Sequence, residues 1–305
     1  MAAQVELWVV LSFAAACFQT LRFMLQKVVS TKTLTATGAT FARFLYSAPI
    51  IVVAIAGYLI ATGQQVTIPD VVNFWLFASS GAVAQVVATV ALVTLFKSHN
   101  FAVGVTLMKS EVILSAILGF ILLGDSLGGV ALIAILIGVA GVLFLSPTSG
   151  AAGWGWRDIF NPSVGLGLGA GALFAVSAVC YRGASLEIAS ADAVLRAGLT
   201  LAAVTSMQMI GMWFWLSWRD RPQISAVWHA RRVAVWIGLM SLAGSFCWFF
   251  AFTLQAAALV KAVGQIELAL SLLASVMFFG EKITARELIG MALLCGSILL
   301  LVLLG

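Results

Sequence analysis

The chain has 305 residues, of which 63% are apolar and only 9% are charged, and its mean hydropathy is +1.13. Soluble domains average about 45–50% apolar and about 25% charged residues, so a globule of this size could not hide its apolar surface from water. The composition excludes a soluble domain, a disordered chain and a coiled coil, and it indicates that lipid is the main solvent. The net charge of +5 comes from basic residues spread among helix ends, which does not indicate nucleic-acid binding.

Ten largely apolar stretches are each long enough to cross a bilayer as a helix. They lack the alternation of membrane β-strands, and helices satisfy their own backbone hydrogen bonds in lipid. We therefore expect an all-α polytopic membrane protein with ten transmembrane helices. The expected spans are 5–28, 34–62, 70–96, 101–123, 127–146, 163–186, 190–218, 232–255, 258–279 and 284–304.

The sequence contains an internal repeat. Glu111 precedes Asp125 by 14 residues in KSEVILSAILGFILLGD, and Glu267 precedes Glu281 by 14 residues in GQIELALSLLASVMFFGE. An offset of 156 residues relates both pairs. We expect a first five-helix repeat over 1–146, a connecting loop over 147–162 and a second five-helix repeat over 163–305.

Because five is an odd number of crossings, the second repeat must enter the membrane with the opposite orientation. Inverted repeats of this kind are typical of secondary transporters, whose substrate site lies at the repeat interface near the bilayer midplane. A duplicated membrane scaffold without transport is the structural alternative.

The ten spans, the duplication and the apolar helices that end in LLGD and FFGE before a Gly-rich helix resemble the drug/metabolite transporter superfamily, EamA type. The resemblance covers nearly the whole chain. It implies a carrier in the bacterial inner membrane, often an exporter of amino acids or other small metabolites. Many members of that family carry a proline near the positions of Glu111 and Glu267, so this chain departs from the family pattern at these two acids.

Glu111 and Glu267 lie near the middle of the fourth and ninth expected spans. An ionisable side chain at the bilayer centre costs at least about 2.5–3.5 kcal/mol on insertion scales, so two acids at equivalent positions indicate a function. A carboxyl group in a low-dielectric cavity can exchange protons near neutral pH, which makes both residues candidates for substrate binding and proton coupling. The structural alternative is a buried ion pair or hydrogen bond that fixes helix packing.

A polar stripe runs along the first span, where Gln19, Arg22 and Gln26 recur at helical spacing. Arg22 lies inside the apolar stretch and needs a partner, for which Glu111 is the candidate. The counterparts of the stripe in the sixth span, 155 residues later, are Phe174, Ser177 and Tyr181.

Two further pairs of polar residues occupy equivalent faces of the third and eighth spans. Gln85 and Thr89 lie one turn apart in the third span, and their counterparts are Ser241 and Ser245, with Trp248 on the same face. Small polar residues in membrane helices commonly serve helix packing. Their convergence in both halves favours a shared central cavity.

The charges and aromatic rings of this predicted cavity indicate a class of ligand. The forked guanidinium of Arg22 suits a carboxylate or phosphate, and Glu267 with aromatic neighbours suits an amine through charge and cation–π attraction. We expect a zwitterionic or cationic amphiphilic substrate, such as an amino acid or an amine. The expected substrate-binding residues are Gln19, Arg22, Gln26, Gln85, Thr89, Glu111, Phe174, Ser177, Tyr181, Ser241, Ser245, Trp248 and Glu267.

Other charges within the spans are assigned structural roles. Lys261 lies off the helical face of Glu267, and it is expected to snorkel or to line a neighbouring path, as is Lys109. Arg43 and its counterpart Arg196 are expected to pair near helix ends and to hold each half together.

No motif for an enzyme, a metal site or a nucleotide accompanies these residues. His99 and His229 lie near helix ends without a nucleophile–base arrangement, and the four cysteines lie singly in apolar stretches. GLGLGAG at 165–171 lacks a preceding strand and a P-loop lysine, so it indicates close helix packing and not ATP binding. We expect no enzymatic activity, no cofactor and no bound metal.

The leading interpretation is a secondary active transporter that works by alternating access, an exporter with proton coupling through Glu111 or Glu267. An uptake carrier, a multidrug or organic-cation exporter and, less favoured, a lipid flippase stay open. The expected partners are a small-molecule substrate, the lipid bilayer and protons, with no nucleic acid, and the chain is expected to be a monomer or a homodimer. Basic loops after the odd-numbered spans place both termini outside the cell by the positive-inside rule.

Overall fold

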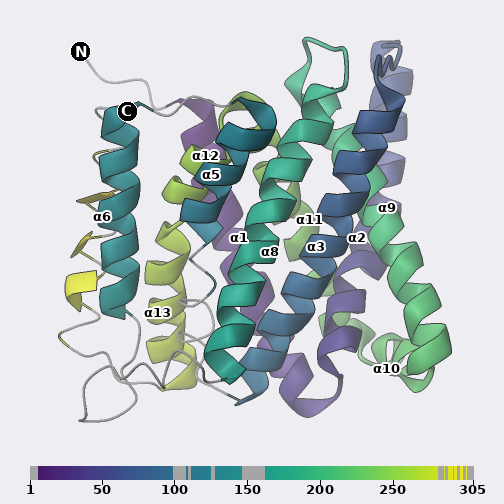
Figure 1. Cartoon of the computed structure of the whole chain (residues 1–305). Coiled ribbons are helices and arrows are strands. Elements are labelled where there is room, and N and C mark those ends of the chain that lie inside the picture. The colour runs from purple at the N-terminus through teal and green to yellow at the C-terminus, as the bar shows by residue number, and fades with distance from the viewer. Residues whose placement is uncertain are drawn as a thin grey trace.

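The computed structural model describes residues 6–98, 111–124, 128–145 and 162–280, together with Met108 and isolated positions between 285 and 300. Within these ranges every regular element is an α-helix, and most of the helices stand side by side in one bundle (Figure 1). Helix α6 lies at one edge of the bundle, and α9 and the short α10 lie at the opposite edge. The helices are α1 (Leu7–Lys32), α2 (Ala36–Thr62), α3 (Val71–Ser98), α5 (Glu111–Leu123), α6 (Gly129–Leu145), α8 (Pro162–Leu186), α9 (Ala193–Arg219), α10 (Pro222–His229), α11 (Arg231–Leu254), α12 (Ala257–Val263) and α13 (Ile266–Phe279).

Seven helical segments of the described ranges are long and apolar enough to cross a membrane, namely α1, α2, α3, α8, α9, α11 and the α12–α13 pair taken together. This confirms the prediction of an α-helical, multi-pass membrane protein. The expected fourth and tenth spans fall partly outside the described residues, and so do His99, Lys109, Asp125 and Glu281.

The outer surface of the bundle is apolar. Large side chains such as Ile60 and Phe278 are exposed over 85% and 74% of their surface. Each square ångström of apolar surface kept in water forgoes about 25 cal/mol of stabilisation, so many such side chains on one surface require lipid around them. The interior of the described residues combines many alanine and serine side chains with leucine, valine, isoleucine and aromatic ones.

The main helix contacts join the two halves of the sequence. α1 packs along α11, α3 packs along α8, and α2 lies against both α9 and α11. α5 packs on α8 and α12, and α13 packs on α1. The interior is therefore built between the halves more than within either of them.

The close contact between α2 and α11 depends on Gly238 of α11, which has no side chain. A Cβ at this position would overlap the Cβ of Tyr46 on α2 and would lie 3.1 and 3.2 Å from the backbone C and Cα of that residue. Lipid tails are as apolar as the helices, so membrane helices gain stability from close backbone contact, which small residues allow.

The structure differs from the expected ninth span, 258–279, because that span is divided into α12 and α13. The amide of Gln265 donates to the Ala262 carbonyl (3.1 Å) and the amide of Glu267 donates to the Gly264 carbonyl (3.0 Å). These tight i→i−3 bonds replace the α-helical pattern. A Cβ on Gly264 would overlap the outer edge of the Trp248 indole, so only glycine fits at this boundary.

Glu267 lies in the first turn of α13, next to this break near the middle of the expected span. Most of the expected fourth span before Glu111 lies outside the described residues. The segment between the expected spans 190–218 and 232–255 contains a helix that was not expected, α10, which begins at Pro222. Proline suits a first helical turn because the amide it lacks would have had no partner there.

We predict that Gly238→Ala lowers the stability of the bundle by about 1–3 kcal/mol, because the added methyl group forces α2 and α11 apart. The measurement is thermal unfolding of the purified protein in detergent. Gly57→Ala in α2 is the matched control, since a Cβ there meets no atom within 4 Å. Equal melting temperatures for the two variants would contradict the close approach.

Candidate functional site

Five charged side chains are buried in the described part of the interior. Arg22, Arg43, Glu111, Lys261 and Glu267 expose 7% of their surface or less. They come from five different helices, α1, α2, α5, α12 and α13. Ionised groups in a low-dielectric interior are stable only when partners compensate the lost hydration, so the contacts of these five residues define the site.

Lys261 and Glu111 form a buried ion pair that joins α12 to α5. The Lys261 Nζ lies 3.2 Å from the Glu111 Oε2. Sequence reasoning set Lys261 aside and proposed Arg22 as the partner of Glu111. In the structure Arg22 bonds Gln26 of its own helix, and Lys261 supplies the cation opposite Glu111.

Two aromatic rings of α11 cover the ammonium group of this pair. The Lys261 Nζ is 4.6 Å from the centroid of the Trp248 ring and 6.0 Å from that of Phe252. The two rings stack on each other with centroids 5.8 Å apart and an interplanar angle of 17°. Cation–π attraction of this kind stabilises an ammonium group that has lost water.

A hydrogen-bonded chain links α11 to α13 through α1. The Trp248 Nε1 donates to the Gln19 Oε1 at 2.9 Å, and the Gln19 Nε2 donates to the Glu267 Oε2 at 2.8 Å. The indole can only donate, so the orientation of the Gln19 amide is determined by its partners.

Arg22 is held by its own helix. Its Nη1 donates to the Gln26 Oε1 at 3.1 Å, and its guanidinium lies 4.1 Å from the centroid of the Phe23 ring. The Gln26 Nε2 in turn donates to the Ala39 carbonyl of α2 at 3.2 Å. Gln26 therefore positions Arg22 and ties α1 to α2.

Arg43 is bound by hydroxyl groups and not by an acid in the contacts that the structure describes. Its Nε donates to the Ser241 Oγ (2.7 Å), its Nη2 to the Ser245 Oγ (3.1 Å) and its Nη1 to the Thr89 Oγ1 (3.4 Å). The expected pairing of Arg43 near a helix end is wrong, because the side chain is buried between α2, α3 and α11. The sequence did contain a signal for this site, because Thr89 aligns with Ser245 and both hydroxyl groups can accept hydrogen bonds from a buried cation.

A second polar network, which sequence reasoning missed, is centred on Gln208 of α9. The Gln208 Nε2 lies within hydrogen-bond distance of the Gln85 Oε1 (3.0 Å), the Ala82 carbonyl (3.1 Å) and the Tyr181 hydroxyl (3.2 Å). The Tyr181 hydroxyl donates to the Gly81 carbonyl at 2.9 Å. These bonds join α9, α3 and α8.

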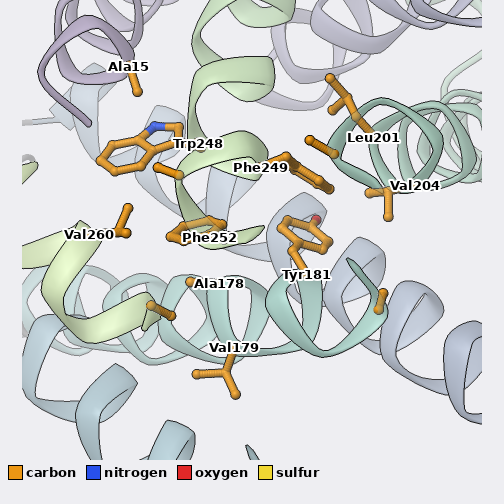
Figure 2. Packing of buried hydrophobic residues seen from close by; sticks show 14 of the residues in the cluster. Ala15, Ala178, Val179, Tyr181, Leu201, Val204, Trp248, Phe249, Phe252 and Val260 are labelled. Atoms are coloured by element: carbon orange, nitrogen blue, oxygen red, sulfur yellow. The ribbon is translucent and has the colours of Figure 1, made fainter. Parts of the chain in front are cut away.

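Tyr181 also belongs to the aromatic cluster between α8 and α11. Its ring stacks on Phe249 with centroids 4.4 Å apart. In Figure 2 these two rings face each other between the helices, with Trp248 and Phe252 farther along α11 towards Val260 of α12, whereas Val179 points away from the cluster. The polar end of Tyr181 thus meets the Gln208 network while its ring completes the aromatic cluster.

These groups surround a small cavity of about 20 Å³, enough for about one water molecule. Eight of the expected site residues line it, and the other five lie behind these and contact Arg22, Arg43, Lys261 or Gln19. Sequence reasoning missed Ala178, Phe249, Phe252 and Lys261 in the lining. The eight expected residues that line the cavity are Gln19, Arg22, Gln85, Phe174, Ser177, Tyr181, Ser245 and Trp248.

The arrangement of the chain recurs in a protein of known structure. A chain described only as "Crystal structure of protein" matches with a TM-score of 0.65 and 16% sequence identity, over 95% of this chain and 99% of its own. Identity this low shows a shared fold and says nothing of activity. No protein-family model matches the sequence, and no curated protein matches it. The resemblance to EamA-type transporters is therefore a prediction from the sequence pattern.

Proposed function

We propose that the protein is a secondary active transporter that moves a small amphiphilic metabolite across a membrane by alternating access. The observation that carries this proposal is the small cavity, lined by Arg22 and Lys261, between helices of both halves of the chain. Lys261 of the second half faces Glu111 of the first, and Gln19 of the first half contacts Trp248 and Glu267 of the second. A substrate that enters this cavity contacts both halves at once, as alternating access requires.

The packing of the helices supports two inverted five-helix repeats, 1–146 and 163–305, within a ten-helix protein. A two-fold relation between the repeats would exchange α1 with α8 and α3 with α11. The α1–α11 contact would then become the α8–α3 contact, and both are extensive in the structure. The α5–α8 contact would become the α13–α1 contact, the α2–α9 contact would map onto itself, and all three are present.

The volume of the cavity favours a carrier over a channel. A space for about one water molecule is too small for a metabolite, so the passage of one through this cavity requires helices to move apart. The boundary between α12 and α13 is a suitable place for this movement, because its short i→i−3 bonds interrupt the α-helical pattern next to Lys261 and Glu267. The location in a bacterial inner membrane, the export direction and the family rest on the sequence resemblance.

The first test is flux in proteoliposomes that contain the purified protein and a mixture of radiolabelled amino acids and amines. We expect saturable exchange, faster with a pH gradient than without one if Glu111 or Glu267 carries protons. Flux that increases linearly with concentration would contradict a carrier. Saturable flux with no dependence on the gradient would remove proton coupling alone.

The roles of Glu111 and Glu267 in transport can be tested by substitutions that remove the charge. We predict that Glu267→Gln and Glu111→Gln each lower flux at least tenfold, because the charges that organise the cavity are lost. Glu267→Gln should still elute as a folded species in gel filtration, whereas Glu111→Gln leaves the Lys261 ammonium without its partner and should also melt at a lower temperature. Glu187→Gln, the same substitution just after α8 and outside the cavity, should transport as the parent does. Normal flux in both cavity variants would show that the site is assigned wrongly.

Variants of the Lys261–Glu111 ion pair distinguish a role in transport from a role in helix packing. Lys261→Gln leaves the Glu111 carboxylate buried without its ammonium, which we expect to destabilise the fold by about 3–5 kcal/mol. The double variant Lys261→Gln/Glu111→Gln removes both charges, so it should recover most of the melting temperature but not the flux. A double variant that transports normally would indicate that the pair serves packing only.

A further inference from the structure

The buried interior carries more positive than negative charge. In the described part of the chain three cations, Arg22, Arg43 and Lys261, and two acids, Glu111 and Glu267, are buried. When all five groups are ionised, one positive charge is in excess. An excess charge in a low-dielectric interior is unfavourable unless a group of opposite sign compensates it.

The excess lies on the arginine side of the cavity. Lys261 and Glu111 neutralise each other at 3.2 Å. Glu267 is then the one buried acid of the described residues that is left to offset the two guanidinium groups of Arg22 and Arg43. The three hydrogen bonds of Arg43 go to hydroxyl groups, which carry no charge.

The cavity exposes the cations and not the acids. Arg22 and Lys261 line it, whereas Glu111 and Glu267 lie behind Lys261 and Gln19. A small space with two cations in its lining and little water has a positive potential that favours an anion.

We propose that the cavity binds its ligand through a carboxylate held between Arg22 and Lys261, with the apolar body of the ligand against Phe174 and Phe249. One of the five N–H donors of Arg22 bonds Gln26, and a guanidinium has further donors in the fork that suits a carboxylate. One carboxylate balances the single excess charge. An amine without a carboxylate would add to the excess, and a phosphate monoester, close to a dianion at neutral pH, would overcompensate it.

This inference rests on the proposed function in one respect, namely that the bound ligand is the transported substrate. It narrows the substrate class to amphipathic carboxylates. An amino group on the substrate is compatible with the site, but it is not what the site selects. The ligand is larger than this cavity, so binding requires the helices around it to move apart.

The test is binding of four probes of similar shape to the full-length protein in a non-ionic detergent at constant ionic strength. Phenylacetate is the carboxylate, 2-phenylacetamide the neutral analogue, phenethylamine the cation and phenyl phosphate the phosphate monoester. Hexanoate serves as a second carboxylate without a ring. Isothermal titration calorimetry and thermal shift report binding, because a ligand of the folded state raises its stability in proportion to ln(1 + [L]/Kd).

We expect saturable binding of phenylacetate or hexanoate, at least tenfold tighter than binding of the amide, the amine or the phosphate. Arg22→Gln should weaken carboxylate binding at least tenfold, and Arg22→Lys, which restores the charge, should recover part of it. Arg196→Gln is the matched control, because Arg196 bonds the Ser185 carbonyl away from the cavity lining.

The outcomes separate this inference from the proposed function. Carboxylate binding without any flux would leave the inference standing and overturn the transporter proposal. Saturable flux of amines with no binding of either carboxylate would overturn the inference and leave a transporter. Tighter binding of phenethylamine or phenyl phosphate, or an Arg22→Gln variant that binds phenylacetate as the parent does, would also overturn it.

Discussion

An ion that has left both water and the lipid headgroups must be neutralised by the protein, and this constraint organises the interior. Lys261 and Glu111 neutralise each other, with the Lys261 Nζ 3.2 Å from the Glu111 Oε2. The rings of Trp248 and Phe252 cover the ammonium group. The two charged residues come from different halves of the chain. Docking of the halves and neutralisation of the buried charges are therefore one event, and either half alone would expose an unpaired ion to lipid.

Polar contacts, more than apolar ones, determine how the halves fit together. Apolar helices gain little by exchanging lipid tails for each other, so the register of helix pairs depends on small residues and hydrogen bonds. Arg43 of α2 bonds Ser241 and Ser245 of α11, and Gln208 of α9 bonds the backbone of α3. Both bridges lie beside the cavity, so the same side chains that align the halves also shape the space between them.

The helical spans were predictable because lipid requires about 20 apolar residues for each crossing, a signal that needs no knowledge of tertiary contacts. The lining residues Ser177 and Ser245 were found because the halves share an alignment. The role of Lys261 was not predictable, since a helical-wheel angle relates residues of one continuous helix and α12 ends at Val263, with the partner on α5. Gln208 gave no signal either, because the equivalent position of the first half is Ile55.

The hydrogen-bonded chain from Trp248 through Gln19 to Glu267 has a single direction. The indole N–H holds the amide oxygen, so the amide NH₂ must point at the Glu267 Oε2, and that oxygen must accept. Gln19 of α1 therefore fixes the Trp248 ring and the Glu267 carboxyl group relative to each other. The same ring rests on Gly264, where α12 gives way to α13. A displacement of α1 that breaks these two bonds would release the ring and, with it, the boundary between the two short helices.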